Sequence, residues 1–237
     1  MRAVSIHPRP DQITELTRGL QLPLPEVPTV HLDIIAESLL QAFGDIRAQA
    51  PATVASGTES EVTALLEARL NAMIEHEPLW GQLVLCVARG KESLSFDGSH
   101  LEKRPDLSIY LSNRNRSFPL ITEAKIIDAA ASKTEALYCD NGIRRFVEGE
   151  YAWGNREAFM IAYVRDGSSI GTKLTPFLSN AVSQSPPGYF VEGLPMATGS
   201  GGFDLAHSKH GRSFLYSSHS SERLEPGSIS IWHLWLS

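Results

Sequence analysis

The feature that most constrains this fold is a run of three strand-like segments, two of which carry charges. Residues 80–90, 105–113 and 117–127 are rich in β-branched and aromatic residues and are separated by Gly, Ser, Asn and Asp. This pattern predicts an antiparallel meander of three strands. The second segment begins with Pro-Asp at residues 105–106, and the third contains Glu-x-Lys at residues 123–125. Charges inside a half-buried sheet need a counter-charge or a surface location.

The turn between the second and third segments brings two acids together. A turn centred between Arg114 and Asn115 pairs Asp106 with Glu123 across the hairpin. Side chains alternate along a strand, so Lys125 shares the face of Glu123. Two carboxylates whose Cβ atoms are about 5 Å apart repel each other, so we expect a positive charge between them. Mg²⁺ or Mn²⁺ is suited to oxygen ligands of this kind.

A helix with a defined start precedes these strands. Thr58 followed by Glu61 is a capping-box pattern, which predicts a helix over residues 58–76. Its inward face is expected to hold Val62, Leu66, Arg69 and Met73, flanked by Leu65 and Leu70. At about 100° per residue Glu59 lies close to that face, whereas Glu61 points away and has a capping role. Glu59 is therefore expected to reach the sheet, with Glu61 as the alternative because helix starts shift by a residue or two.

The rest of the chain contains further helices and strands and then becomes rich in turn residues. Before the first capping box, the pattern predicts an arm with a short amphipathic stretch over 1–28, a helix over 30–50 and a linker over 51–57. After the three strands, it predicts a helical region that is capped by Ser132 and Glu135 and interrupted near 141–142. A strand over 158–164, a helix over 172–182 and closing strands over 213–218 and 228–237 are predicted to follow. Residues 185–212 carry Pro, Gly and polar residues and are predicted to be loop.

Composition limits the class of protein. The chain has 237 residues, 42% apolar and 20% charged, and no run approaches the roughly 20 apolar residues of a membrane span. Its start lacks the apolar run of a secretory signal, so we expect a cytoplasmic protein. In that reducing compartment Cys86 and Cys139 are expected to be buried free thiols. The formal net charge of −6 does not favour a polyanion partner, although basic residues cluster locally.

The charged residues of the hairpin and of the preceding helix resemble the motifs of the PD-(D/E)XK nuclease superfamily, the restriction-endonuclease-like fold. The residues that match, in order, the helix-borne Glu, the Pro-Asp and the acid-x-Lys of that family are Glu59, Pro105-Asp106 and Glu123-Ala124-Lys125. The resemblance covers roughly residues 55–185. Each motif is short and weak alone, and the conjunction of strand context, facing acids and a preceding acidic helix carries the resemblance.

The resemblance implies a fold and a division of the chain. The fold class is α/β (α+β), with an αβββαβ core in which a central mixed sheet is flanked by helices. Residues 1–54 are then an N-terminal arm and helix that pack on the body. Residues 55–237 are a nuclease-like domain with a C-terminal strand extension.

The resemblance also implies a metal-dependent endonuclease that hydrolyses phosphodiester bonds, with DNA favoured over RNA. Asp106 and Glu123 would hold Mg²⁺ or Mn²⁺, Lys125 would serve the attacking water or the transition-state charge, and Glu59 would assist. The alternatives are a ribonuclease and a non-catalytic interaction subunit. The negative net charge favours control by a protein partner or a homo-oligomer, as in the effector subunit of a restriction or phage-defence system.

Two further groups of residues are candidates for ligand contacts. Arg144 and Arg145 come after the acid-x-Lys strand and are expected to contact nucleic-acid phosphates, with an Arg145–Glu148 surface pair as the alternative. The second group comprises late histidines and a Gly-rich segment: His207, His210, His219 and residues 197–204. No cysteine lies near the histidines in the sequence, so solvated or substrate-contacting histidines are favoured over zinc ligands. The Gly-rich segment is expected to be a flexible loop over the site.

Overall fold

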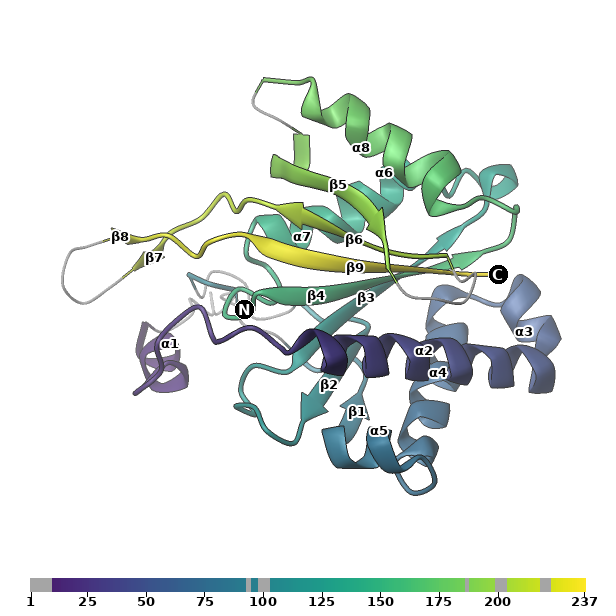
Figure 1. Ribbon diagram of the computed structural model, residues 1–237, viewed down its shortest axis with the longest axis horizontal. Helices are drawn as coiled ribbons and strands as arrows, with labels where there is room; N and C mark the ends of the chain where they lie inside the picture. The colour runs from purple at the N-terminus through teal and green to yellow at the C-terminus, as the bar shows by residue number, and fades with distance from the viewer. Residues whose placement is uncertain (1–9, 93–94, 98–102, 186–187, 199–203, 218–222) are drawn as a thin grey trace, which may run out of the picture.

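A mixed β-sheet with helices on both faces organises the chain in this computed structural model (Figure 1), which describes residues 10–92, 95–97, 103–185, 188–198, 204–217 and 223–237. The strand order is β1-β2-β3-β4-β9-β6-β5, and the small pair β7-β8 is separate. The strands are β1 (Val84–Ala88), β2 (Leu107–Leu111), β3 (Leu120–Ile127), β4 (Glu157–Val164), β5 (Val191–Ala197), β6 (Asp204–His210), β7 (Tyr216–Ser217), β8 (Arg223–Leu224) and β9 (Ile229–Leu236). β3, β4 and β9 are parallel, and the other neighbours are antiparallel. The predicted class of a mixed sheet flanked by helices is confirmed.

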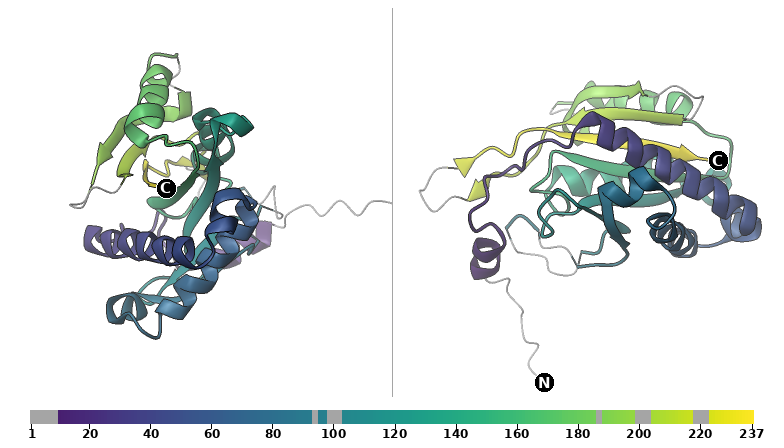
Figure 2. Two further views of the ribbon diagram at one scale, coloured as in Figure 1. Left: turned by 90° about the vertical axis from the view of Figure 1, so that its right-hand side faces the viewer. Right: turned by 60° about the horizontal axis from the view of Figure 1, so that its bottom comes forward.

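The helices divide between the two faces of the sheet (Figures 1 and 2). They are α1 (Pro10–Leu16), α2 (Thr29–Gln49), α3 (Pro51–Ser56), α4 (Glu59–Met73), α5 (Pro78–Leu83), α6 (Glu135–Tyr138), α7 (Arg144–Val147) and α8 (Thr175–Val182). Helices α2 and α4 contribute to one hydrophobic core, and α6, α7 and α8 contribute to the other. The sheet therefore has two apolar faces, which explains why every residue of β4 is buried.

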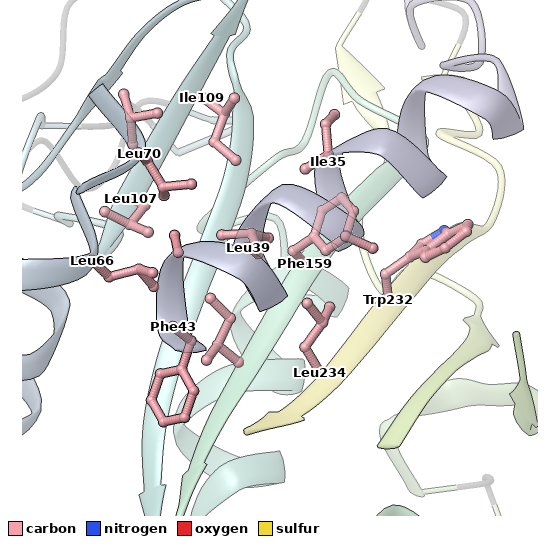
Figure 3. Packing of buried hydrophobic residues seen from close by; sticks show 14 of the residues in the cluster. Ile35, Leu39, Phe43, Leu66, Leu70, Leu107, Ile109, Phe159, Trp232 and Leu234 are labelled. Atoms are coloured by element: carbon pink, nitrogen blue, oxygen red, sulfur yellow. The ribbon is translucent and has the colours of Figure 1, made fainter. Parts of the chain in front are cut away.

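The first core is built from helical residues spaced three and four apart, which pack on alternate residues of the central strands (Figure 3). The labelled residues are Ile35, Leu39 and Phe43 of α2, Leu66 and Leu70 of α4, and Leu107, Ile109, Phe159, Trp232 and Leu234 of the sheet. Burying one such side chain stabilises the fold by roughly 1.5–3 kcal/mol. Helix α2 confirms the helix predicted over residues 30–50, and the domain boundary at residue 54 stays a prediction.

The second core contains the helical region that follows β3. Helices α6 and α7 are joined by a π-helical segment, Cys139–Ile143, which confirms the predicted interruption. Gly142 lies close to β4, since an added Cβ would be 2.2 Å from Met160 Cε. The π segment shifts the angular position of every later residue in the region, so the faces of α7 cannot be extrapolated from α6.

The hairpin register predicted from the turn is confirmed. Leu107 pairs with Thr122 and Ile109 with Leu120. The same antiparallel register, continued one residue outward, places Asp106 opposite Glu123. The two acids therefore lie just beyond the end of the β2–β3 pairing that is farther from the turn.

Helix α4 confirms most of its pattern. Thr58 and Glu61 form both hydrogen bonds of a capping box. Val62, Leu66 and Met73 are buried as predicted. Arg69 does not join them, because its guanidinium turns outward to a salt bridge 2.7 Å from Asp45.

Several local predictions were wrong, and each has a structural reason. Residues 51–57 are not a linker, because Pro51 starts the short helix α3 and Gly57 ends it. The cap before α6 is Thr134, with no side-chain hydrogen bond, while Ser132 has a φ of 58° at the end of a preceding 3₁₀ turn. Residues 80–83 end α5 rather than starting a strand.

The segment predicted to be loop over residues 185–212 contains β5 and β6. β5 is an edge strand, where Pro195 and the register shifts at Gly193 are tolerated. β6 pairs with β9 over its whole length, even though its sequence is rich in His and Ser. Its buried polar side chains are hydrogen-bonded, since Ser208 contacts both His210 and His233. The polar residues therefore do not prevent β6 from lying inside the sheet.

The burial of the two cysteines and the character of the helices can be compared with the predictions made from composition. Both cysteines are free; Cys139 is buried as predicted, but Cys86 is exposed on the edge strand β1. None of the helices in the described ranges has the length and apolar character of a membrane span.

We predict that Leu39→Ala lowers the free energy of unfolding by about 2–5 kcal/mol, because it leaves a cavity between α2 and the sheet. Leu39 is fully buried. Urea denaturation measures the change. The control Leu79→Ala, at a side chain that is 65% exposed, should change stability by no more than about 0.5 kcal/mol. Equal effects of the two substitutions would contradict the packing of α2 on the sheet.

Candidate active site

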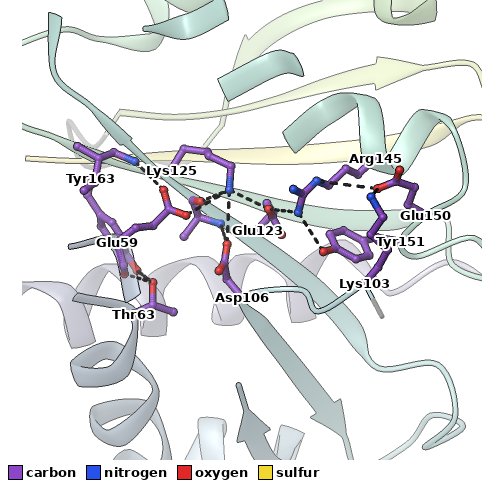
Figure 4. Close-up of polar contacts among 12 residues, drawn as sticks. Glu59, Thr63, Lys103, Asp106, Glu123, Lys125, Arg145, Glu150, Tyr151 and Tyr163 are labelled. Atoms are coloured by element: carbon purple, nitrogen blue, oxygen red, sulfur yellow. Dashed lines mark hydrogen bonds and ion pairs between the residues drawn. The ribbon is translucent and has the colours of Figure 1, made fainter. Parts of the chain in front are cut away.

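The predicted charged residues meet around one ammonium group (Figure 4). Lys125 Nζ lies 2.8 Å from Glu123 Oε1, 3.4 Å from Glu59 Oε1 and 3.7 Å from Asp106 Oδ2. Glu123 and Lys125 come from β3, Asp106 immediately precedes β2, and Glu59 is the first residue of α4. Glu61, the alternative to Glu59, is occupied by its capping hydrogen bonds. The structure thus brings all four predicted catalytic residues together.

The outer edge of β3 explains why two of the acids lie here. Within the described residues, β2 pairs with β3 only as far as Thr122, so the next backbone N–H groups on that edge have no strand partner. Asp106 Oδ2 accepts the N–H of Ala124 at 2.8 Å, and Glu59 Oε2 accepts the N–H of Ile126 at 3.3 Å. The two carboxylates therefore replace the missing strand and satisfy donors that would otherwise be unpaired.

The positive charge expected between the facing acids is supplied by the protein itself. Lys125 Nζ donates to Glu123 Oε1 and also to the carbonyl of Ala124, at 2.6 Å. Repulsion between Asp106 and Glu123 therefore does not by itself require a metal ion, in contrast to what the hairpin alone indicated.

Arg145 belongs to the same group of residues. Its Nη1 donates to Glu123 Oε1 at 2.8 Å and to the Tyr151 hydroxyl at 3.0 Å. Glu150 Oε2 lies 3.9 Å from Arg145 Nε and 3.0 Å from Lys103 Nζ, which extends the row of charges away from Lys125 (Figure 4). Sequence reasoning missed Lys103, Glu150 and Tyr151; a basic residue three positions before Asp106 was the available signal for Lys103.

Arg144 lies elsewhere. Its Nη2 pairs with Asp140 at 2.6 Å, and its guanidinium is 5.5 Å from the centre of the Tyr189 ring. Adjacent helical residues point about 100° apart, and the two arginines accordingly reach different partners. The alternative pairing of Arg145 with Glu148 is wrong, because Glu148 lies near Arg144.

Burial sets the protonation behaviour of the cluster. Burial and the neighbouring charge of Asp106 raise the pKa of Glu123 to about 7, against the opposing effect of Lys125 and Arg145. Burial also raises the pKa of Glu59. Burial alone would lower the pKa of Lys125, but the charges of Glu123, Asp106 and Glu59 together raise it. The ammonium of Lys125 is thus held in its charged form, while the three neighbouring acids together carry more negative charge than Lys125 and Arg145 offset.

The donor atoms fit a weakly liganded Mg²⁺ or Mn²⁺ better than a zinc site. Glu123 Oε2 is buried, and no hydrogen-bond partner for it is present in the part of the chain that the structure describes. Within the same residues no group of three or more His, Cys, Asp or Glu is placed to hold a metal ion. Mg²⁺ commonly takes only one or two carboxylates and completes its shell with water and phosphate, and Asp106 and Glu123 can supply those carboxylates.

One of the predicted histidines, His210, belongs to a buried hydrogen-bonded chain together with His233, Ser208 and Tyr138. His210 Nδ1 lies 2.9 Å from the carbonyl of Tyr189 and must donate to it, so its Nε2 accepts from Ser208 Oγ at 2.7 Å. Ser208 then accepts from His233 Nε2 at 2.7 Å, and His233 Nδ1 accepts from Tyr138 at 2.9 Å. Burial lowers the pKa of His210 to about 4 and lowers the pKa of His233 as well, so both rings are neutral.

This chain of donors overturns one prediction about the histidines. His210 is fully buried rather than solvated. His207 stacks on Trp232, with ring centres 5.9 Å apart. His219 and residues 199–203 of the Gly-rich segment lie outside the described residues.

Comparison of the chain with protein-family models, with curated proteins and with solved structures found no match. Any functional assignment of this chain therefore rests on its own residues and on the geometry of the site.

We predict that Glu123 makes stability depend on pH. Its folded-state pKa of about 7 exceeds its ordinary value of 4.5, so folding favours the protonated form. The stability from this group is complete below about pH 4.5 and is lost as the pH rises through about 7. Glu123→Gln should therefore flatten the fall in the free energy of unfolding between these pH values, as measured by urea denaturation of the metal-free protein.

A direct titration provides the control. Burial also raises the pKa of Glu157 to about 7, so carbon-13 NMR of glutamate carboxyls should show two signals with midpoints near pH 7. Glu123→Gln should remove one, and Glu157→Gln should remove the other. If the signal lost in Glu123→Gln has its midpoint below pH 5, burial does not dominate the electrostatics of the cluster.

Proposed function

We propose that this protein is a metal-dependent nuclease that hydrolyses phosphodiester bonds. The observation that carries the proposal is the position of Lys125 Nζ, within 4 Å of carboxylate oxygens of Glu59, Asp106 and Glu123. These are the residues that match the PD-(D/E)XK motifs. Glu59 and Asp106 are far from Lys125 in the sequence, and their convergence on its ammonium supports the proposal beyond the short motifs alone.

The arrangement of elements around the site supports the same proposal. Helix α4 is followed by the short helix α5 and the three antiparallel strands β1, β2 and β3, then by the α6–α7 region and by β4, which is parallel to β3. Apart from α5, this order is compatible with the αβββαβ core that the resemblance implies, and it supports the proposal. The site lies beyond the end of the β2–β3 pairing, where the side chains of Asp106 and Glu59 remain partly exposed and a substrate can approach them.

Asp106 and Glu123 would hold Mg²⁺ or Mn²⁺ through Asp106 carboxylate oxygens and the unpaired Glu123 Oε2. When bound, such an ion polarises a phosphoryl oxygen and lowers the pKa of a water molecule. The two carboxylates contribute their charge and fixed orientation. Asp106 is oriented by the Ala124 N–H, and Glu123 by Lys125 and Arg145.

Lys125 would act as a hydrogen-bond donor. Its ammonium donates to Glu123, to the Ala124 carbonyl and, at 3.4 Å, to Glu59. A water molecule or a phosphoryl oxygen would take the place of the longest of these three bonds, where the ammonium can offset developing negative charge. Glu59 accepts a hydrogen bond from the backbone of β3 through Oε2 and leaves Oε1 facing Lys125. Glu59 would thus serve as a positioning residue for Lys125 and as a candidate acceptor for a proton from water.

DNA is proposed as the substrate over RNA, as the resemblance implies, within a restriction or phage-defence assembly. A chain with a formal net charge of −6 attracts a polyanion weakly at physiological salt. We therefore propose that a protein partner or a second copy of the chain assists binding.

We predict that the purified protein nicks plasmid DNA in Mg²⁺ or Mn²⁺ and not in EDTA. Asp106→Asn, Glu123→Gln and Lys125→Met should each lower the cleavage rate by roughly 100-fold or more. The matched control Glu148→Gln changes an exposed carboxylate outside the cluster and should cleave at the wild-type rate.

Metal binding gives a readout besides activity. Calorimetric titration with Mn²⁺ should show uptake that Asp106→Asn abolishes and Glu148→Gln preserves. Labelled DNA and RNA of one sequence, incubated under the same conditions, separate deoxyribonuclease from ribonuclease. Absence of metal-dependent cleavage of both, with wild type and variants alike, would favour a non-catalytic interaction subunit.

A further inference from the structure

A cavity of about 280 Å³ opens beside the carboxylates, on the same part of the sheet. Ser108 and Ile121, which pair across β2 and β3, contribute to its wall. Each lies two residues along its strand from Asp106 and Glu123 respectively, so side-chain alternation puts them on the same face. Two residues of a strand span roughly 7 Å. The cavity is therefore the immediate continuation of the candidate active site.

The walls of the cavity are apolar and firmly held. Phe118, Pro119, Ile121 and Trp153 line it, and the rings of Phe118 and Trp153 are in edge contact with centres 5.0 Å apart. The apolar walls and the polar residues beside them suit a mostly apolar group with a polar edge.

The loop that carries Trp153 is fixed by a buried arginine. Arg212 Nη1 donates to the carbonyl of Trp153 at 2.9 Å and to that of Ala152 at 3.2 Å, and its Nη2 donates to the carbonyl of Asn155. Ala152, which also lines the cavity, has a φ of 48°, in the left-handed region that a non-glycine residue rarely adopts. Asn155 Nδ2 donates to the carbonyl of Pro119 at 2.8 Å and joins the loop to the start of β3. The cavity wall is thus a built feature and not a gap between loosely packed side chains.

The rim of the cavity is basic. Lys91 and Arg116 are exposed there, and among the described residues neither forms a salt bridge. Glu92, the acid on the rim, is neutralised by Arg104 at 2.8 Å. The chain as a whole is acidic, but these two cations, which have no acidic partner within the described residues, give the rim a local positive charge that matches an anionic ligand.

We propose that this cavity holds the base of one unpaired nucleotide of the substrate strand, with Lys91 and Arg116 at the flanking phosphates. The inference rests on the proposed function and specifies its substrate as single-stranded or locally unpaired nucleic acid. A base has two apolar faces and a polar edge. The apolar walls of the cavity suit the faces, and Ser108 and Asn155, which also line it, suit the polar edge. A base inside a duplex cannot enter a cavity without leaving its stack, so the cavity favours single-stranded or locally unpaired sites, including those in a supercoiled plasmid, over intact duplex.

Binding measured in EDTA separates this proposal from catalysis. The probe is a short single-stranded DNA with one fluorescent base analogue, compared with its duplex form and with single-stranded RNA of the same sequence. Wild type should bind the single strands more tightly than the duplex. Ser117→Trp, which places a bulky ring at the cavity mouth, and Arg116→Ala should each weaken single-strand binding about tenfold. The controls Ser179→Trp and Lys173→Ala lie on exposed positions of α8 and the preceding turn and should bind within about twofold of wild type.

The outcomes distinguish the two proposals. Equal binding of single strands and duplex, unaffected by Ser117→Trp, overturns the cavity proposal even if the protein cleaves DNA in Mg²⁺. Cavity-dependent binding of single strands with no cleavage in any metal supports the cavity and overturns the nuclease. A shift in base-analogue fluorescence that Ser117→Trp abolishes, together with wild-type circular dichroism of that variant, shows that the base enters the cavity in a folded protein.

Discussion

The backbone of β3 beyond Thr122 determines where the charges of this protein meet. β2 begins at Leu107, so within the described residues the N–H groups of Ala124 and Ile126 on this edge of β3 have no strand opposite them. Unpaired backbone donors are costly when buried, and here they are taken by the carboxylates of Asp106 and Glu59. That requirement fixes two acids beside a third, Glu123, which is almost fully buried in the same strand.

Lys125 is the central residue of the site, because in the described part of the chain its ammonium is the one positive group that lies within 4 Å of all three carboxylates. Arg145 offsets the remaining charge on Glu123 from the opposite side. Three acids and two bases leave one excess negative charge if all are ionised, which adds to burial in raising the pKa values of Glu123 and Glu59.

The sequence was informative where local rules determine geometry. The hairpin register followed from the position of the turn, and strand alternation then placed Glu123 and Lys125 together. The capping box of Thr58 and Glu61 fixed the first turn of α4 and thereby separated Glu59 from Glu61. Each inference needed only the spacing of a few neighbouring residues.

The sequence was uninformative where tertiary contacts override local preference. The residues of β6 are typical of a loop because they include His and Ser, yet Ser208 and His210 are satisfied by a chain of hydrogen bonds that begins at Tyr138 and passes through His233. Arg145 reaches Glu123 across the π segment of the helical region, an irregularity whose effect on side-chain direction no periodicity predicts. The role of Lys125 as the counter-charge could not be predicted from the sequence, because it depends on the distances from its ammonium to three carboxylates at once.

The distribution of charge limits how the protein can meet nucleic acid. Lys125 and Arg145 are engaged with carboxylates, so they add little to the field felt by an approaching strand. Under our proposal the cations that meet the flanking phosphates are Lys91 and Arg116. Because each phosphate contact contributes a roughly fixed increment to the salt dependence of binding, two contacts give a shallow dependence and little affinity. The rest of the affinity must then come from apolar contact with a base, which is what the cavity beside Ile121 provides, or from a partner that contributes the missing positive charge.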